Sequence, residues 1–280
     1  MNICLFKTDE LNKPISLHDQ RGEHLIKILH KKVGDTFTAG VVDGKAGIAT
    51  ITEINDDGIT FFFEPKWEGK KLNPLEMIIG IPRPIQLKRL LRDIAALGVC
   101  KVHLTGTELG EKSYMKSALV EKGSAYKMLL DGTVQAGSTH VPEFAIHQTL
   151  KECLDSISDD SIKFALDNVN PECSLSQAMV DANISAAEKI SDGENLADGK
   201  NLADGKNFVD GKNFVDGKNF AAEKKHVIAA IGSERGWTDK ERKLLEDYGY
   251  TKCGIGERIM RTETAATVAG AIILSNLKII

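Results

Sequence analysis

The sequence predicts an α/β protein with a parallel sheet, preceded by a small β-rich domain. Residues 1–72 contain short β-branched or aromatic runs separated by Gly, Asp and Asn, which is typical of the short strands of a small barrel. From residue 73 onward, apolar strand-like runs alternate with helical patterns, and that order is typical of parallel strand–helix–strand units. We therefore expect two domains, 1–72 and 73–280.

Composition indicates an ordinary globular protein. Of the 280 residues, 42% are hydrophobic and 27% charged, which suffices for a buried core without disulfide staples. No apolar run reaches the length of a membrane span, and the N-terminus lacks a signal-peptide core, so we expect a cytoplasmic protein without membrane contact. The formal net charge of −4 means that any surface that binds nucleic acid must be a local basic patch.

Cysteine and histidine give no metal-site signature. The five cysteines are odd in number and never form a C-x-x-C pair, which favours free thiols in a reducing compartment. The seven histidines show no ligand spacing, so we expect no metal. There is also no G-x-G-x-x-G after a first strand and no G-x-S-x-G, which argues against Rossmann-type enzymes and serine hydrolases.

The first domain is expected to contain four strands and one helix. The helix covers Gly22–Leu29, and a polar connector, Trp67–Pro74, ends the domain. Lys27, Lys31 and Lys32 form a basic edge on and after the helix; the alternative is a solvated helix end. The expected strands are Ile3–Phe6, Thr36–Val42, Gly47–Thr52 and Ile59–Phe63.

The second domain begins with a strand over Leu75–Ile81. An amphipathic helix over Gln86–Leu97 follows, because leucine and isoleucine recur there at helical spacing, and Gly98 stands where a helix ends. A strand over Val99–Leu104 comes next. The sequence then predicts a long helix from about Ser113 to Gln135 and a buried strand over Lys163–Asp167.

Residues 192–221 are five tandem hexapeptides that begin with Asp-Gly. A period of six can indicate a β-helix, but each unit has only two apolar residues and nothing caps the array. The aspartates match no EF-hand spacing. We therefore expect a disordered insertion in a surface loop.

Two later segments share one pattern: an apolar run, a Gly-containing turn and then a helix. The first is Ile228–Thr238, where Thr238 and Glu241 form a capping box. The second is Gly254–Ala266, which leads into a last helix from about Thr262 to Leu277. Such turns expose main-chain N–H and C=O groups to a ligand, so the two together would make a pocket built mostly from backbone.

The phrase Arg258-Ile259-Met260-Arg261-Thr262-Glu263-Thr264-Ala265, with the loop Gly232–Gly236, resembles the RsmE family of SPOUT (trefoil-knot) RNA methyltransferases. That family methylates N3 of a uridine in small-subunit (16S) ribosomal RNA. The resemblance implies a trefoil-knot α/β domain behind a PUA-like β-barrel that touches RNA. It also implies a homodimer built with the last helix, and ribosomal RNA or the small ribosomal subunit as partner.

The resemblance further implies S-adenosylmethionine as cofactor and assigns roles to residues. Arg261 would stabilise the uracil oxygens or a phosphate, while Glu263 or Glu234 would orient Arg261 or accept a proton. Arg258, like Lys27, Lys31 and Lys32, would contact RNA. For Glu263 the alternative is a favourable interaction with the N-terminus of the last helix. For Arg258 the alternative is an ordinary surface charge. The implied cofactor-binding residues are Leu166, Ile231, Gly232, Gly236, Ile255, Gly256, Ile259 and Met260.

The sequence departs from the family pattern at Arg235, where the family usually has glycine. Arginine there is costly if the backbone needs a positive φ. An arginine usually found after Thr107-Glu108 and another near Thr139 are also missing. A second hypothesis is therefore a divergent member that binds RNA or ribosomes with lost or altered activity. A third, ribose 2′-O-methylation, is disfavoured by the β-rich first domain.

Overall fold

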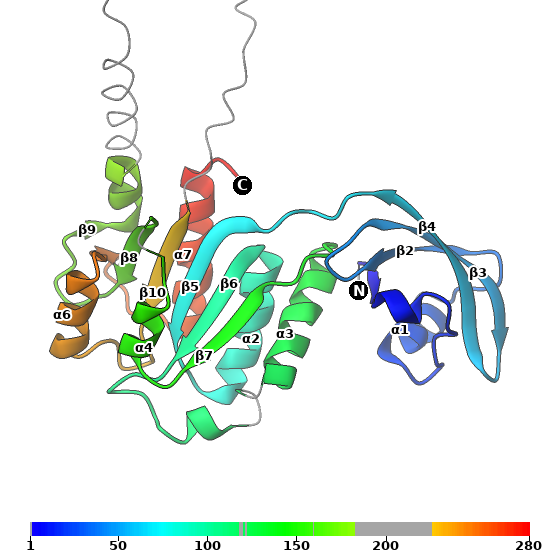
Figure 1. Cartoon of the computed structure of the whole chain (residues 1–280), viewed down its shortest axis with the longest axis horizontal. Coiled ribbons are helices and arrows are strands. Elements are labelled where there is room, and N and C mark those ends of the chain that lie inside the picture. Colours follow the sequence, from blue (N-terminus) through cyan, green and yellow to red (C-terminus); the bar gives the residue numbers. More distant parts are fainter. Residues whose placement is uncertain (1, 118–119, 121, 159, 183–225) are drawn as a thin grey trace, which may run out of the picture.

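The structure, a computed structural model of the chain, describes residues 2–117, 120, 122–158, 160–182 and 226–280. It has two parts, a four-stranded sheet and a seven-stranded sheet flanked by helices (Figure 1). The predicted α/β class, with a parallel sheet behind a small β-rich part, is confirmed. The hexapeptide insertion predicted at 192–221 lies outside the described residues.

The four-stranded sheet has the order β1-β2-β3-β4. β1 is parallel to β2, the other neighbours are antiparallel, and Ile15 adds an antiparallel bridge to Ile59. Aromatic side chains from three strands fill its core, with the Phe6 and Phe61 rings 4.8 Å apart. The strands are β1 (Cys4–Phe6), β2 (Thr36–Val41), β3 (Ala46–Asn55) and β4 (Gly58–Trp67), and the helical turns are η1 (Thr8–Glu10), α1 (Gln20–Glu23) and η2 (His24–Ile28).

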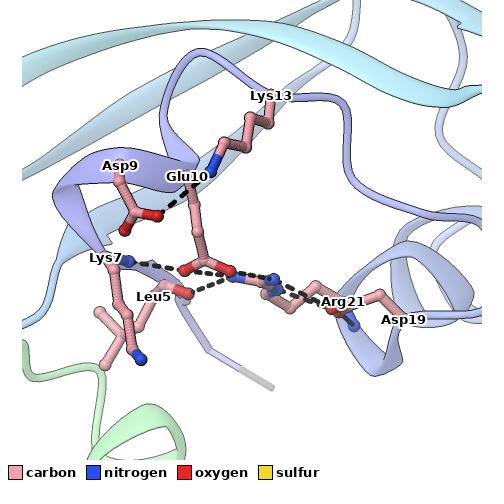
Figure 2. Close-up of polar contacts among 7 residues, drawn as sticks. All are labelled: Leu5, Lys7, Asp9, Glu10, Lys13, Asp19 and Arg21. Atoms are coloured by element: carbon pink, nitrogen blue, oxygen red, sulfur yellow. Dashed lines mark hydrogen bonds and ion pairs between the residues drawn. The ribbon is translucent and has the colours of Figure 1, made fainter.

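Arg21 ties the start of the chain to this sheet (Figure 2). Its guanidinium donates to the Leu5 carbonyl at 2.8 Å, to Glu10 at 2.9 Å and to Asp19 at 2.9 Å. It also lies 4.7 Å from the centroid of the Phe6 ring. Hydrogen bonds from Arg21 hold the pKa of both the Glu10 and the Asp19 carboxyl below their ordinary values. One cation therefore joins β1, η1 and α1.

The seven-stranded sheet has the order β7-β6-β5-β10-β8-β11-β9, and all of its pairings are parallel. The strands are therefore buried on both faces and must send their carboxyl ends to one edge. Their bounds are β5 (Asn73–Gly80), β6 (Val99–Thr105), β7 (Glu143–His147), β8 (Ile162–Leu166), β9 (Cys173–Ser174), β10 (Val227–Ile231) and β11 (Thr251–Gly254).

Helices cover the two faces of this sheet. Alternate strand residues such as Met77 and Ala229 pack against α2 (Pro84–Ala96), α3 (Lys122–Gln135) and α7 (Thr262–Asn276). The intervening residues, such as Ile78 and Ile228, face α4 (Leu150–Asp155) and α6 (Asp239–Asp247). The result is a three-layer α/β/α domain (Figure 1).

The start predicted for the long helix, about Ser113, is wrong, whereas its predicted end at Gln135 is confirmed. The chain instead forms a short 3₁₀ turn, η3 (Tyr114–Lys116), and Ser117 is extended with ψ 146°, so the helical pattern breaks before α3 begins at Lys122. Sequence reasoning also missed α4, β7 and β9, which are short elements of two to six residues. The knot itself stays a prediction.

Hydrogen bonds join the two parts. Thr139 Oγ1 donates to the Gly44 carbonyl at 2.7 Å, and the Val141 N–H donates to Asp43 Oδ1 at 2.9 Å. Beside this junction, residues of both parts line a cleft of about 770 Å³, with Arg21 on one side and Gln135 on the other. In the part of the chain that the structure describes, no helix is long and apolar enough to cross a membrane.

Replacing Arg21 with Met should destabilise the first domain. We expect a loss of about 1–3 kcal/mol at pH 7, because two partly buried carboxylates lose a charged donor. Their folded pKa values are depressed, so their stabilisation is fully present above the ordinary values of 4.5 and 3.8 and disappears as the pH falls through the folded values. As the pH is lowered from 5 to about 2, the difference in unfolding free energy between wild type and Arg21→Met should therefore shrink, as measured by urea denaturation.

Lys13→Met, which removes an exposed ion pair with Asp9, is the control and should unfold like wild type.

Candidate functional site

Three neighbouring strands end together at one edge of the large sheet. Ile231 at the end of β10 pairs with Leu166 at the end of β8, and Leu166 pairs with Cys253 of β11. The loops that follow these strands, 167–170, 232–237 and 255–261, enclose a pocket of about 360 Å³. Its volume falls in the range of small-molecule sites. The carboxyl edge of a parallel sheet is where such sites form, because the loops there share one origin.

All eight residues predicted to bind the cofactor line this pocket. The structure thus brings together three segments that are far apart in the sequence, the first at residue 166 and the last ending near residue 260. Glu234 and Arg258 line it as well, whereas Arg261 and Glu263 are outside its lining. The lining residues to which the sequence analysis assigned no role in the site are Asp167, Asn168, Val169, Ser233, Arg235, Thr262 and Ala265.

Glycine is required at three points of the wall. Gly236 and Gly256 have φ of 73° and 119°, a backbone that side chains rarely adopt. A Cβ on Gly232 would lie 3.0 Å from the carbonyl carbon of Gly236, because the loop folds back on itself through a Ser233–Gly236 bridge. Ser233 is buried, and its hydroxyl has no hydrogen-bond partner among the described residues. A polar ligand atom in the pocket is a suitable partner for that hydroxyl.

Arg235 does not carry the backbone strain that the sequence suggested. The described non-glycine residues with positive φ are His30, Asp43, Asn170 and Lys278, so Arg235 is outside the left-handed region. Its side chain is exposed at the pocket rim. The condition under which an arginine would be costly here is therefore not met.

A buried ion pair positions the first loop. Asp167, whose side chain is 2% exposed, accepts from Arg242 Nε at 2.6 Å and from the Val169 N–H at 3.0 Å. The same bond to Asp167 raises the pKa of Arg242. Trp237 Nε1 donates to the Leu166 carbonyl at 3.1 Å. A polar run directly after a buried strand, Asp167-Asn168, was the signal that sequence reasoning passed over.

The three predicted catalytic residues occupy different settings. Glu234 accepts from the Arg83 N–H at 2.8 Å and so links the pocket to the turn before α2. Arg261 is the N-cap residue of α7 and is exposed. Glu263 is buried in the first turn of α7, and its Oε2 has no hydrogen-bond partner among the described residues.

The predicted RNA-binding lysines lie on the four-stranded part, away from the pocket lining. Lys27 in η2 is exposed and pairs with Glu23 at 2.7 Å. Lys31 and Lys32 follow η2, and the same segment exposes Ile28 and Val33. The three lysines therefore share one short segment with an apolar surface.

Comparison with known proteins identifies the family. Residues 70–191 and 197–274 match the RNA methyltransferase domain family. The chain is 34% identical to Ribosomal RNA small subunit methyltransferase E of Treponema pallidum, over 99% of this chain and 91% of that protein. It is 30% identical to Ribosomal RNA small subunit methyltransferase E 1 of Borreliella burgdorferi, over 99% of both. This chain belongs to the RsmE-like family of SPOUT ribosomal RNA methyltransferases.

Solved structures share the fold of this RsmE-like protein. Ribosomal RNA small subunit methyltransferase E of Neisseria gonorrhoeae, bound to S-adenosyl methionine, superposes with a TM-score of 0.67 at 17% identity, covering 98% of this chain and 97% of that one. A probable rRNA methyltransferase of Porphyromonas gingivalis gives 0.67 at 15% identity, covering 98% of both. The fold thus persists where few residues are shared.

Replacing Arg235 with Gly should not stabilise the protein. Since Arg235 is outside the left-handed region, glycine relieves no strain and adds unfolded-state entropy, which costs about 0.4–1 kcal/mol. Gly236→Ala, at φ 73°, should cost about 1–2 kcal/mol. Urea denaturation of both variants measures these changes in the free energy of unfolding. A clear stabilisation by Arg235→Gly would mean that the loop is strained at that residue.

Proposed function

We propose that this protein is an S-adenosylmethionine-dependent methyltransferase that acts on N3 of a uridine in small-subunit ribosomal RNA. The observation that carries the proposal is the 34% identity to Ribosomal RNA small subunit methyltransferase E over 99% of this chain. The alignment spans both sheets and all three loops of the pocket, because it covers almost the whole chain.

The pocket suits the proposed cofactor. Leu166, Ile231 and Ile255 supply apolar surface for an adenine ring, while the glycines leave main-chain groups accessible. The unpartnered Ser233 hydroxyl suits a polar edge of the ligand. When bound, S-adenosylmethionine supplies an electrophilic methyl group on a sulfonium.

The remaining chemistry falls to side chains at the rim. A bond must form between uridine N3 and the methyl carbon as the sulfur–carbon bond breaks, and the N3 proton must leave. Glu234, exposed at the pocket, is a proton acceptor in this proposal, and Arg258 and Arg261 offset the negative charge that develops on the uracil oxygens. Glu263 would act from the first turn of α7 by orienting Arg261.

The proposal includes partners. Lys27, Lys31, Lys32 and Arg258 would contact RNA phosphates, and ribosomal RNA would place the protein in the cytoplasm. The proposal also includes a homodimer, in which Ile259, 84% exposed on the loop that lines the pocket, would be available for burial against a second copy. Light scattering coupled to size-exclusion chromatography measures the mass in solution, which should be that of two chains.

Calorimetric titration with S-adenosylmethionine and S-adenosylhomocysteine comes first, followed by incubation with small ribosomal subunits and nucleoside analysis. We expect binding of both compounds and a new N3-methyluridine. Gly256→Trp should abolish binding, because a large side chain on a left-handed glycine fills the pocket. Binding without methylation of any subunit would favour a divergent RNA-binding protein instead.

Two substitutions at Glu234 separate its chemistry from its positioning role. Glu234→Gln keeps an oxygen that accepts the Arg83 N–H but removes the charge, whereas Glu234→Ala removes both. If Glu234 accepts the proton, both variants should lose roughly 10²–10⁴-fold in single-turnover rate. Activity retained in Glu234→Gln and lost in Glu234→Ala would show that it only positions the loop.

A further inference from the structure

A chain of titratable side chains, of which His103 and His147 are buried, crosses the sheet face opposite α7. His103 Nδ1 lies 2.9 Å from His147 Nε2, and His103 Nε2 lies 3.0 Å from Glu76 Oε2. The second Glu76 oxygen lies 2.9 Å from His226 Nε2. His103 is 1% exposed and His147 is 8% exposed. None of these groups takes part in the proposed methyl transfer, yet burial of polar side chains in a core is costly.

A cysteine thiol lies close to the two imidazoles. His103 Nδ1 or Nε2, a ring nitrogen of His147 and Cys153 Sγ all lie within 4.8 Å of one another, and Cys153 is fully buried in α4. The three residues come from β6, β7 and α4, so the fold alone brings them together. Two imidazoles and a thiolate are a ligand set that selects zinc and related transition metals over calcium or magnesium.

From this geometry we infer that His103, His147 and Cys153 form a site for a transition-metal ion of the Zn²⁺ class. Two Zn–N bonds of about 2.0–2.1 Å in tetrahedral geometry separate their nitrogens by about 3.3 Å. The imidazole nitrogens, 2.9 Å apart, need to open by only about 0.4 Å to admit the ion. The fourth position is left for a small ligand such as water.

Glu76 supplies the outer support that metal-binding histidines require. With the Nε2 proton of His103 donated to the Glu76 carboxylate, the Nδ1 lone pair points toward His147. A carboxylate that holds the far nitrogen of a ligand histidine fixes its tautomer and orientation. Glu76 is held in turn by His226.

Charge and proton balance are satisfied. The bond that forms is metal to sulfur, and the Cys153 thiol releases its proton to solvent. The His147 proton moves from Nε2 to Nδ1, so no oxidant or reductant is needed. The dication, the Cys153 thiolate and the Glu76 carboxylate sum to zero, which lowers the cost of a buried ion.

The cluster lies near a cavity and on a short helix. Gln148, which follows His147, and Leu150 line a cavity of about 730 Å³. The helix α4 has only six residues and is too short to be stable alone. A metal bound to Cys153, His103 and His147 would join this helix to β6 and β7.

The test uses the full chain, stripped with a chelator and titrated with Zn²⁺ by calorimetry and with Co²⁺ by absorption. We expect one ion per chain, the visible bands of tetrahedral Co²⁺ and a thiolate-to-Co²⁺ charge-transfer band. Zn²⁺ should raise the melting temperature, since free ion at 100 times Kd reduces the unfolding equilibrium constant about 100-fold.

Variants separate this site from general thiol binding. Cys153→Ser should abolish the charge-transfer band, and Glu76→Gln should weaken affinity about 10–100-fold without removing a ligand. Cys173→Ser, a half-buried cysteine outside the cluster, is the matched control and should bind like wild type. The inference would be overturned if the unmutated protein showed no Co²⁺ bands at a millimolar concentration of the ion. It would also be overturned if the bands were unchanged in Cys153→Ser. If Cys153→Ser fails to fold, X-ray absorption of the Zn²⁺-loaded wild type decides, because one sulfur and two nitrogens are expected around the ion.

Discussion

The in-register parallel pairing of β8 between β10 and β11 is the constraint on which the pocket depends. Leu166 is the shared partner of Ile231 and Cys253, so three chain segments turn away from the sheet at the same level. A slip of β8 by one residue would turn its side chains to the opposite faces of the sheet and would shift the level at which its loop begins. Trp237 and Arg242 hold the first loop from the side of α6, which makes the pocket a product of two layers.

Close packing of α7 supports the same arrangement. A Cβ added at Gly270 would lie 2.9 Å from Met77 Cε and 3.0 Å from Leu97 Cδ1, so a larger residue there would have to displace the ends of these two side chains. At its other end, Thr262 Oγ1 donates to the Gly232 carbonyl at 3.4 Å. The helix that carries the family motif therefore rests directly on the loop that forms the opposite wall of the pocket.

The two faces of the sheet have different characters. On the α7 face the strand residues are apolar and pack against long helices. The other face carries a hydrogen-bonded series of His147, His103, Glu76 and His226. Polar groups of this kind are tolerated only when each finds a partner, and they fix one arrangement of the strands that carry them.

The sequence by itself determined most strands, the helices α2, α6 and α7, and the residues of the second and third pocket loops. Hydrophobic periodicity, caps and glycine turns are local signals. It misplaced the start of α3 and passed over β7, α4 and β9, since elements so short are stabilised by neighbours and not by their own pattern. Tertiary structure alone decided that Asp167 anchors a loop, that Arg235 is unstrained and that His103 meets His147 across 44 residues. Those facts depend on which strands lie side by side, and strand pairing is a long-range property of the folded chain.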